Sequence, residues 1–202
     1  MNFILESEVL DDYLQELTEV NFSDSAIQTL INKFFCSKQT EIEKVHTAFN
    51  FVRDEIAHSW DIQSEVVTCT ASEVLRQKQG ICYAKSNLFA ALLRSQEIPT
   101  GFCYQRLMLF DTPEKGYSLH ALNAVFIRQL NKWIRLDARG NKKGVNAEFS
   151  MFEEKLAFTV NPHFDEVDYP MIYVKPNSKT IDILKQSDDA LVMYLNDLPE
   201  KI

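Results

Sequence analysis

The sequence predicts an α+β fold, because helical patterns fill its first part and strand patterns follow them. In the stretch 40–56, apolar residues recur at intervals of three and four, which is typical of an amphipathic helix. Between 102 and 138, three segments rich in β-branched and aromatic residues read as consecutive strands. No repeat or low-complexity segment interrupts the chain, so we expect one domain over 1–202, with a core at about 40–140.

Composition narrows the classes of function. The chain has 202 residues, 46% hydrophobic and 25% charged, as in ordinary globular proteins. Its net charge of −8 disfavours nucleic acid and anionic membranes as partners. No apolar run is long enough for a membrane span and no secretory signal is visible, so we expect a cytoplasmic protein. Nothing in the sequence indicates an oligomeric state.

The N-terminal part reads mainly as helices. A short strand is expected at 2–5, followed by an amphipathic helix at 11–20 and a second helix at 24–36. A third helix, at 40–56, has the clearest pattern, with apolar side chains at Ile42, Val45, Phe49, Val52 and Ile56. The stretch 57–69 is expected to be a loop with extended pieces.

Two helices are expected to meet at Gly80. Thr70 and Glu73 have the spacing of a capping box, which predicts a short helix that ends at Gly80. A second helix should run from Cys82 to about Ser95, and it is apolar around most of its circumference, so it should be buried. Its first turn carries a thiol. The positive end of a helix dipole favours the thiolate, which is the reactive form of cysteine.

Strands are expected after the turn at 98–101. They should span 102–110, 119–127 and 133–138, with a loop at 111–117 that contains a proline and a glycine. The segment 141–154 reads as a loop, and 172–174 as an edge strand before a proline. One or two closing helices are expected over 178–195, with Ser187 as a possible N-cap between them.

Cys82, His120 and Asp137 form the candidate catalytic set. A cysteine nucleophile needs a base, and that base needs a group that orients it. If the last two strands are joined by a two-residue connection at 128–129, His120 lies directly opposite Asp137. A four-residue loop at 129–132 keeps both on one face but shifts the register by four. In either case we expect Ala121 on the opposite face, and the Cys82 helix on the face of His120.

Three stretches resemble the transglutaminase-like superfamily. The nucleophile region of that family is similar to 70–101, TASEVLRQKQGICYAKSNLFAALLRSQEIPTG, and its histidine strand is similar to HALNAVFI. KWIRLDARGN resembles the strand that ends in the catalytic aspartate. The resemblance implies a papain-like fold, in which a central helix carrying the nucleophile packs against an antiparallel sheet. It is stronger to bacterial transglutaminase-like cysteine proteases than to the large calcium-dependent crosslinking enzymes.

The resemblance implies cofactor-independent acyl transfer through a thioester on Cys82, with His120 as base and acid and Asp137 as the orienting group. The backbone N–H of Cys82 is one expected oxyanion donor. The second is left open among Gln79, Gln77, Gln63 and Trp60. A peptide, isopeptide or small amide is the expected substrate, with water as the acceptor for hydrolysis.

Other interpretations remain open at the level of sequence. A primary amine as acceptor would make the chain a transamidase or acyltransferase, and a chain without turnover would be a binding module on the same fold. Two family features are absent: no tryptophan lies two residues after His120, and Ala138 and Arg139 replace the frequent Pro-Thr after the aspartate. Arg139 is expected either to form a structural ion pair or to bind a substrate carboxylate.

Cys36, Cys69 and Cys103 are expected to be ordinary reduced thiols. A zinc site from Cys82, Cys103, His120 and Asp137 is disfavoured, because the chain lacks the close ligand pairs typical of structural zinc. No metal or cofactor is therefore expected.

Overall fold

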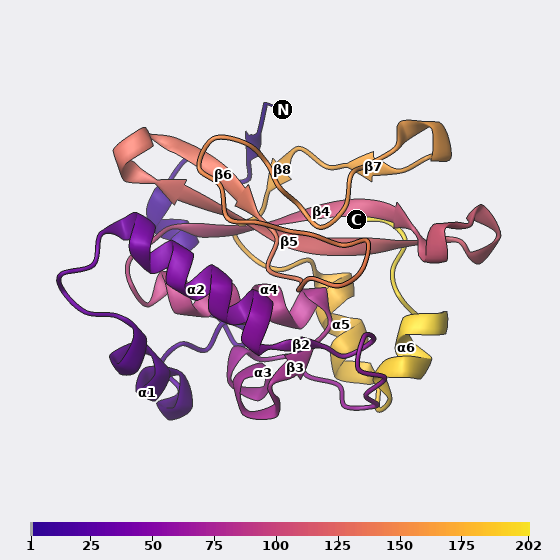
Figure 1. Cartoon of the computed structure of the whole chain (residues 1–202), viewed down its shortest axis with the longest axis horizontal. Helices are drawn as coiled ribbons and strands as arrows, with labels where there is room; N and C mark the ends of the chain where they lie inside the picture. Colours follow the sequence, from indigo (N-terminus) through magenta and orange to yellow (C-terminus); the bar gives the residue numbers. More distant parts are fainter. Residues whose placement is uncertain (1) are drawn as a thin grey trace.

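The computed structural model describes residues 2–202 as a helical layer packed against a four-stranded antiparallel sheet (Figure 1). The strand order is β6-β5-β4-β7, and the bounds are Thr100–Met108 for β4, Tyr117–Ile127 for β5, Lys132–Leu136 for β6 and Val167–Asp168 for β7. Two short parallel pairs lie outside this sheet. They join β1 (Ile4–Leu5) to β8 (Met171–Ile172), and β2 (Ala57–His58) to β3 (Gln79–Gly80). The predicted α+β class is confirmed.

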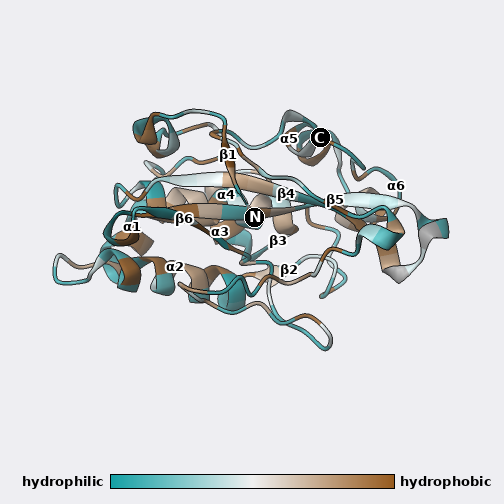
Figure 2. Cartoon of the chain, turned by 90° about the horizontal axis from the view of Figure 1, so that it is seen from above, coloured by the Kyte–Doolittle hydropathy of each residue, from teal (hydrophilic) through white to brown (hydrophobic). Residues whose placement is uncertain are grey.

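Six α-helices accompany the sheet in the described chain. Their bounds are Ser25–Phe34 for α1, Glu41–Glu55 for α2, Ala71–Gln77 for α3, Cys82–Arg94 for α4, Ser178–Gln186 for α5 and Ala190–Asn196 for α6. Thr70 and Glu73 form the predicted capping box at the start of α3, and Thr40 and Glu43 form another at α2. In Figure 2, brown and teal residues alternate along α2, as expected of a helix with one buried face.

Helix α4 is the central helix of the fold. All 13 of its residues are buried, including the polar Lys85, Asn87 and Arg94. It lies below the sheet, with α2 in front of it and α3 beneath it (Figure 1). This confirms the predicted packing of a central helix against an antiparallel sheet.

Several expected boundaries were wrong. The helix expected at 11–20 is reduced to a 3₁₀ helix over Leu10–Leu14, because Gln15 is extended and its carbonyl accepts a hydrogen bond from buried Arg94. Helix α3 ends at Lys78, which is left-handed, and Gly80 belongs to β3 instead of the helix. Ser187 ends α5, whereas Asp189 caps α6 through two backbone N–H groups.

Other parts of the strand pattern also differ from expectation. The short strand β7 was not predicted, because two residues carry no readable alternation. The edge strand expected at 172–174 is instead Met171–Ile172, which pairs with β1. None of the helices formed by residues 2–202 is long and apolar enough to cross a lipid bilayer.

The β5–β6 register differs from both expected registers. Ile127 pairs with Lys132 and Asn123 with Leu136, so the true register lies midway between the two alternatives. The connection is a 3₁₀ turn over Arg128–Leu130, closed by Asn131 in the left-handed conformation. A turn of this kind was not readable from the residues alone. It leaves His120 and Asp137 on one face but not directly opposed.

Helix α4 also packs on a different face of β5 from the one expected. The Tyr83 hydroxyl donates to the Leu119 carbonyl, and Asn123 donates to the Ser86 carbonyl. These contacts place α4 on the face that carries Leu119 and Ala121, not on the face of His120. The thiol therefore approaches His120 from the N-terminal end of α4, at the part of β5 that β6 does not pair with.

Candidate active site

Cys82 is the first residue of α4, and its side chain is 8% exposed. The chain enters the helix through Gly80, where a Cβ atom would lie 2.8 Å from Thr68 Oγ1 and 3.1 Å from the Ala84 methyl group. A larger residue would push the entry strand away from the helix. Glycine is thus required for the close approach that sets the thiol at the helix start.

His120 and Asp137 form a buried hydrogen-bonded pair. His120 Nε2 lies 2.7 Å from Asp137 Oδ2, and the residues are 5% and 1% exposed. Asp137 also accepts backbone N–H bonds from Arg139 at 3.1 Å and Ala157 at 3.0 Å. The Phe158 ring stands perpendicular to the imidazole, with the ring centroids 5.0 Å apart. The carboxylate can reach the ring diagonally because β6 ends at Leu136, just before Asp137.

The surroundings shift the pKa values of His120 and Asp137 in opposite directions. Burial alone would lower the pKa of His120, but the charge of Asp137, the neighbouring Cys82 and hydrogen bonding to both raise it to about 10. Burial would raise the pKa of Asp137. The imidazolium charge, together with the bonds from His120, Ala157 and Arg139, lowers it instead. The two pKa values are thus shifted in opposite directions, which favours the imidazolium–carboxylate form of the pair.

Cys82 and His120 line one cavity of about 760 Å³. Much of its wall is aromatic, from Trp60, Phe110, Phe158, Phe164 and Tyr194. Its lining also includes the cationic residues Arg139, Lys142 and Lys143. The structure thus brings the thiol and the imidazole to one concave site. Asp137 lies behind the imidazole, where a group that orients it would be expected.

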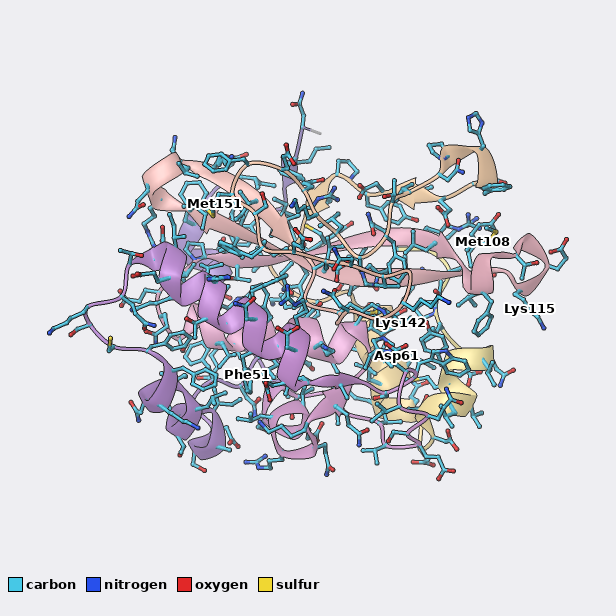
Figure 3. All side chains as sticks on the ribbon, in the orientation of Figure 1. Phe51, Asp61, Met108, Lys115, Lys142 and Met151 are labelled. Atoms are coloured by element: carbon cyan, nitrogen blue, oxygen red, sulfur yellow. The ribbon has the colours of Figure 1, made fainter. Side chains whose placement is uncertain are left out.

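Arg139 forms an ion pair, one of the two expected roles. Its guanidinium contacts both carboxylate oxygens of Asp61 at 2.6 and 2.9 Å. Lys142 joins the same carboxylate at 2.7 Å, and Figure 3 shows its side chain beside Asp61. Burial would raise the pKa of Asp61, but these two cations lower it to about 2. Asp61, on the segment that follows β2, therefore fixes two of the cationic side chains that line the cavity.

Lys85 is a buried cation that sequence reasoning missed. It lies one turn after Cys82 and donates to the Ile56 carbonyl, with 1% of its surface exposed. Burial, followed by the charge of Arg139, lowers its pKa to about 7, against the opposing pull of Asp137 and Asp61. The readable signal was a lysine within an otherwise apolar helix.

Trp60 packs in a cluster with two other aromatic rings. Tyr194, from α6, stacks on it with centroids 4.5 Å apart and 14° between the planes, and Phe110 lies 5.5 Å away. Of the four candidates for the second oxyanion donor, Trp60 is the one that lines the cavity with Cys82. Gln63 instead donates to the Trp60 carbonyl. Tyr194 was not singled out from sequence, because nothing local ties a C-terminal tyrosine to this site.

The other thiols lie elsewhere. Burial raises the pKa of Cys69 to about 11 and that of Cys103 to about 12, and Cys36 is exposed. Cys103 packs with Tyr13 and Leu122 in a separate apolar cluster, so it cannot join Cys82 as a metal ligand. Across residues 2–202, no three His, Cys, Asp or Glu side chains gather as metal ligands would.

Comparisons with known proteins bear on the family and the fold of this chain. The family model of the transglutaminase-like superfamily matches residues 28–138, which include Cys82, His120 and Asp137. A solved structure, "Putative Cysteine Protease from Cytophaga hutchinsonii", shares the fold with a TM-score of 0.52 and 18% identity. The match covers 66% of this chain and 43% of that one. No curated protein matches the sequence.

A second solved structure, described as a TGase, has a TM-score of 0.48 and 18% identity, and the match covers 92% of this chain and 53% of that one. The chain thus spans about half the length, or less, of the solved structures it matches. The family model covers more than half of the chain and contains its central helix and the three main strands. The chain belongs to the transglutaminase-like superfamily.

Proposed function

We propose that this protein is a cysteine-dependent acyl-transfer enzyme that hydrolyses a peptide, an isopeptide or a small amide. The observation that carries this proposal is the 2.7 Å His120–Asp137 pair, in which the imidazole shares a cavity with the Cys82 thiol at the start of α4. A nucleophile, a base and a group that orients the base are the minimum set for covalent acyl transfer.

The geometry suggests the role of each ring nitrogen of His120. Nε2 is engaged by Asp137, so Nδ1 is the nitrogen left to serve Cys82. The thiolate attacks the substrate carbonyl carbon, and the carbonyl oxygen becomes an oxyanion. The Cys82 backbone N–H and the Trp60 indole N–H are the proposed donors to that oxygen.

The two half-reactions then balance. When the tetrahedral adduct collapses, the carbon–nitrogen bond breaks, and His120 Nδ1–H gives its proton to the leaving amine. The acyl group remains on Cys82 as a thioester. His120 next takes a proton from water, and the resulting hydroxide attacks the thioester carbon. The carbon–sulfur bond then breaks, the carboxylic acid leaves, and the Cys82 thiolate and the protonated His120 are restored. A primary amine in place of water would give transamidation.

The test is hydrolysis of N-acetylated peptide amides, with and without an added primary amine, by the whole protein. We expect hydrolysis to exceed amine incorporation, and Cys82→Ser to lower kcat/KM by about 10³-fold or more. Cys36→Ser is the matched control, because that thiol is exposed and lies away from the cavity.

Three results would count against parts of the proposal. Amine incorporation that outruns hydrolysis would favour a transamidase. Turnover that survives Cys82→Ser would remove the thiol from the mechanism. Tight binding of peptide amides without any turnover would favour a binding module on this fold.

A further inference from the structure

The segment that follows α6 returns to the sheet beside His120. In Figure 1 it runs in yellow from α6 back toward the strands. The Pro199 carbonyl accepts a hydrogen bond from the Leu119 N–H at 2.8 Å. Leu119 directly precedes His120, so the C-terminal segment (residues 197–202) is attached to the strand at the candidate active site.

This attachment fills a strand edge that would otherwise be open. Strand β6 pairs with β5 only as far as Asn123, so within residues 2–202 no strand pairs with 117–122 on that side. An open edge presents N–H and C=O groups that bind extended peptides. Here both groups of Leu119 are taken, the N–H by Pro199 and the carbonyl by the Tyr83 hydroxyl.

Side chains hold the C-terminal segment in this position. Leu198 is one of the residues that line the cavity of Cys82 and His120. The Glu200 carboxylate lies 3.8 Å from the Arg106 guanidinium, and Lys179 donates to the Lys201 carbonyl at 3.1 Å. Ile202 packs against the main core. Several separate contacts therefore hold the segment in place, and Leu198 forms part of the cavity lining.

The position of the C-terminal segment determines which leaving groups fit beside His120. In the proposed mechanism His120 protonates the leaving amine, so the leaving group must lie on the His120 side of the thiol. The C-terminal segment is bonded to Leu119, the residue next to His120, and Leu198 lines the same cavity. A long peptide leaving group would compete with Pro199 for the Leu119 N–H and with Leu198 for space.

We propose, resting on the function proposed above, that the C-terminal segment restricts the substrates to acyl donors with a small leaving group. The substrate class is a peptide or acyl chain that ends in a primary amide or a short amide, so that ammonia or a small amine departs. The acyl side enters past the aromatic wall of the cavity. Long chains beyond the reacting carbonyl are excluded by the segment.

The experiment compares two substrate pools on the full-length protein. The first contains N-acetylated dipeptide primary amides with varied side chains, and the second carries the same acyl parts extended by a tripeptide. We expect kcat/KM for the amide pool to exceed that for the extended pool by at least about tenfold, which corresponds to about 1.4 kcal/mol.

Variants of the C-terminal segment test the cause. Leu198→Ala/Pro199→Gly removes the apolar contact and loosens the backbone, so it should raise the ratio of kcat/KM for the extended pool to kcat/KM for the amide pool about tenfold. Leu195→Ala is the matched control, because its side chain is 53% exposed on α6. Leu198→Ala alone, with its thermal unfolding measured, keeps the test valid if the double variant folds poorly.

Each remaining outcome overturns a defined claim. Equal turnover of both pools by the wild-type protein would overturn the restriction but leave the proposed function standing. An equal rise for both pools in the double variant would overturn selectivity, since the segment would then cover the thiol itself. No change for either pool would also overturn it. No turnover of any pool, together with no acylation of Cys82, would instead refute the proposed function.

Discussion

At the scale of single residues, His120 is a buried ring whose positive charge is stabilised by two neighbours, Asp137 and Cys82. Asp137 binds one nitrogen at 2.7 Å, and the neighbouring Cys82 also raises the pKa of the ring. A buried imidazole without such partners loses its proton readily, as His58 shows: burial and the charge of Arg139 hold its pKa well below the usual value. The surroundings, not the residue type, decide which histidine stays charged.

The raised pKa of His120 makes a prediction about stability. Its value changes from an ordinary 6.5 to about 10, so the folded protein holds this proton more tightly than the unfolded chain. The contribution to the free energy of unfolding should be complete below about pH 6.5 and lost as pH rises through about 10. Urea unfolding of wild type and His120→Gln should therefore show a stability difference that shrinks over this range. A difference independent of pH would contradict the shift.

Lys85→Met provides the control with the opposite sign. The pKa of Lys85 is lowered from 10.5 to about 7, so its charged form is less favourable in the folded protein. The cost of burying that charge should be greatest below about pH 7 and should fade toward pH 10.5. Relative to Lys85→Met, the wild type should thus gain stability as pH rises, opposite to the trend for His120→Gln.

Part of the candidate site could be named from the sequence alone. The thiol at a helix start and the ordered histidine and aspartate could be named, because each has a chemical reason to be there. Tyr194 could not, because its place in the cavity of Cys82 depends on how distant segments pack. Lys85 lies one turn after Cys82, but its contact with the Ile56 carbonyl likewise depends on that packing.

At the scale of elements, α4 and β5 define the site, and α6 completes its wall. The capping box of α3 and the start of α4 followed from local rules that need no tertiary information. The register of β6 did not, because it depends on the turn formed at Asn131. The predicted face of β5 for the packing of α4 was also wrong, because strand alternation alone does not say which face a helix covers.

The contact of α6 with Trp60 leads to a second prediction. Tyr194→Ala removes the ring that stacks on the indole at 4.5 Å, so the proposed oxyanion donor should lose its fixed position. We expect kcat to fall about tenfold with little change in KM, and Tyr194→Phe to retain activity because the stack survives. Steady-state kinetics on peptide amides would measure this.

A double variant separates positioning from general damage. If Tyr194 acts through Trp60, adding Tyr194→Ala to Trp60→Phe should cost little beyond the loss caused by Trp60→Phe itself. Fully additive losses, or a Tyr194→Phe variant as impaired as Tyr194→Ala, would argue that the ring does not act through the indole.

At the scale of the whole molecule, a single buried arginine ties together distant parts of the chain. Arg94, 2% exposed at the end of α4, donates to the carbonyls of Gln15, Thr100 and Val174. Burial lowers its pKa to about 10. It therefore fixes the N-terminal segment, β4 and the segment after β8 to the central helix.

Arg94→Leu should accordingly destabilise the whole fold. Three carbonyls would lose their charged donor, and we expect the free energy of unfolding to drop by roughly 3–5 kcal/mol in urea titrations. Arg128→Leu is the control, since its ion pair with Glu41 is half-exposed and should be worth less than about 1 kcal/mol. Equal effects of the two substitutions would show that Arg94 does not join the segments.

The proposed acyl transfer on Cys82 is tested most directly by trapping the thioester. The full-length protein would be mixed with an activated acyl ester, quenched in acid within one turnover, digested and analysed by mass spectrometry. We predict an acyl group on the peptide that contains Cys82, and none on Cys36, Cys69 or Cys103. The adduct should disappear in Cys82→Ser and form more slowly in His120→Gln. Ester turnover without acylated Cys82, or with the label on another thiol, would contradict the proposed mechanism.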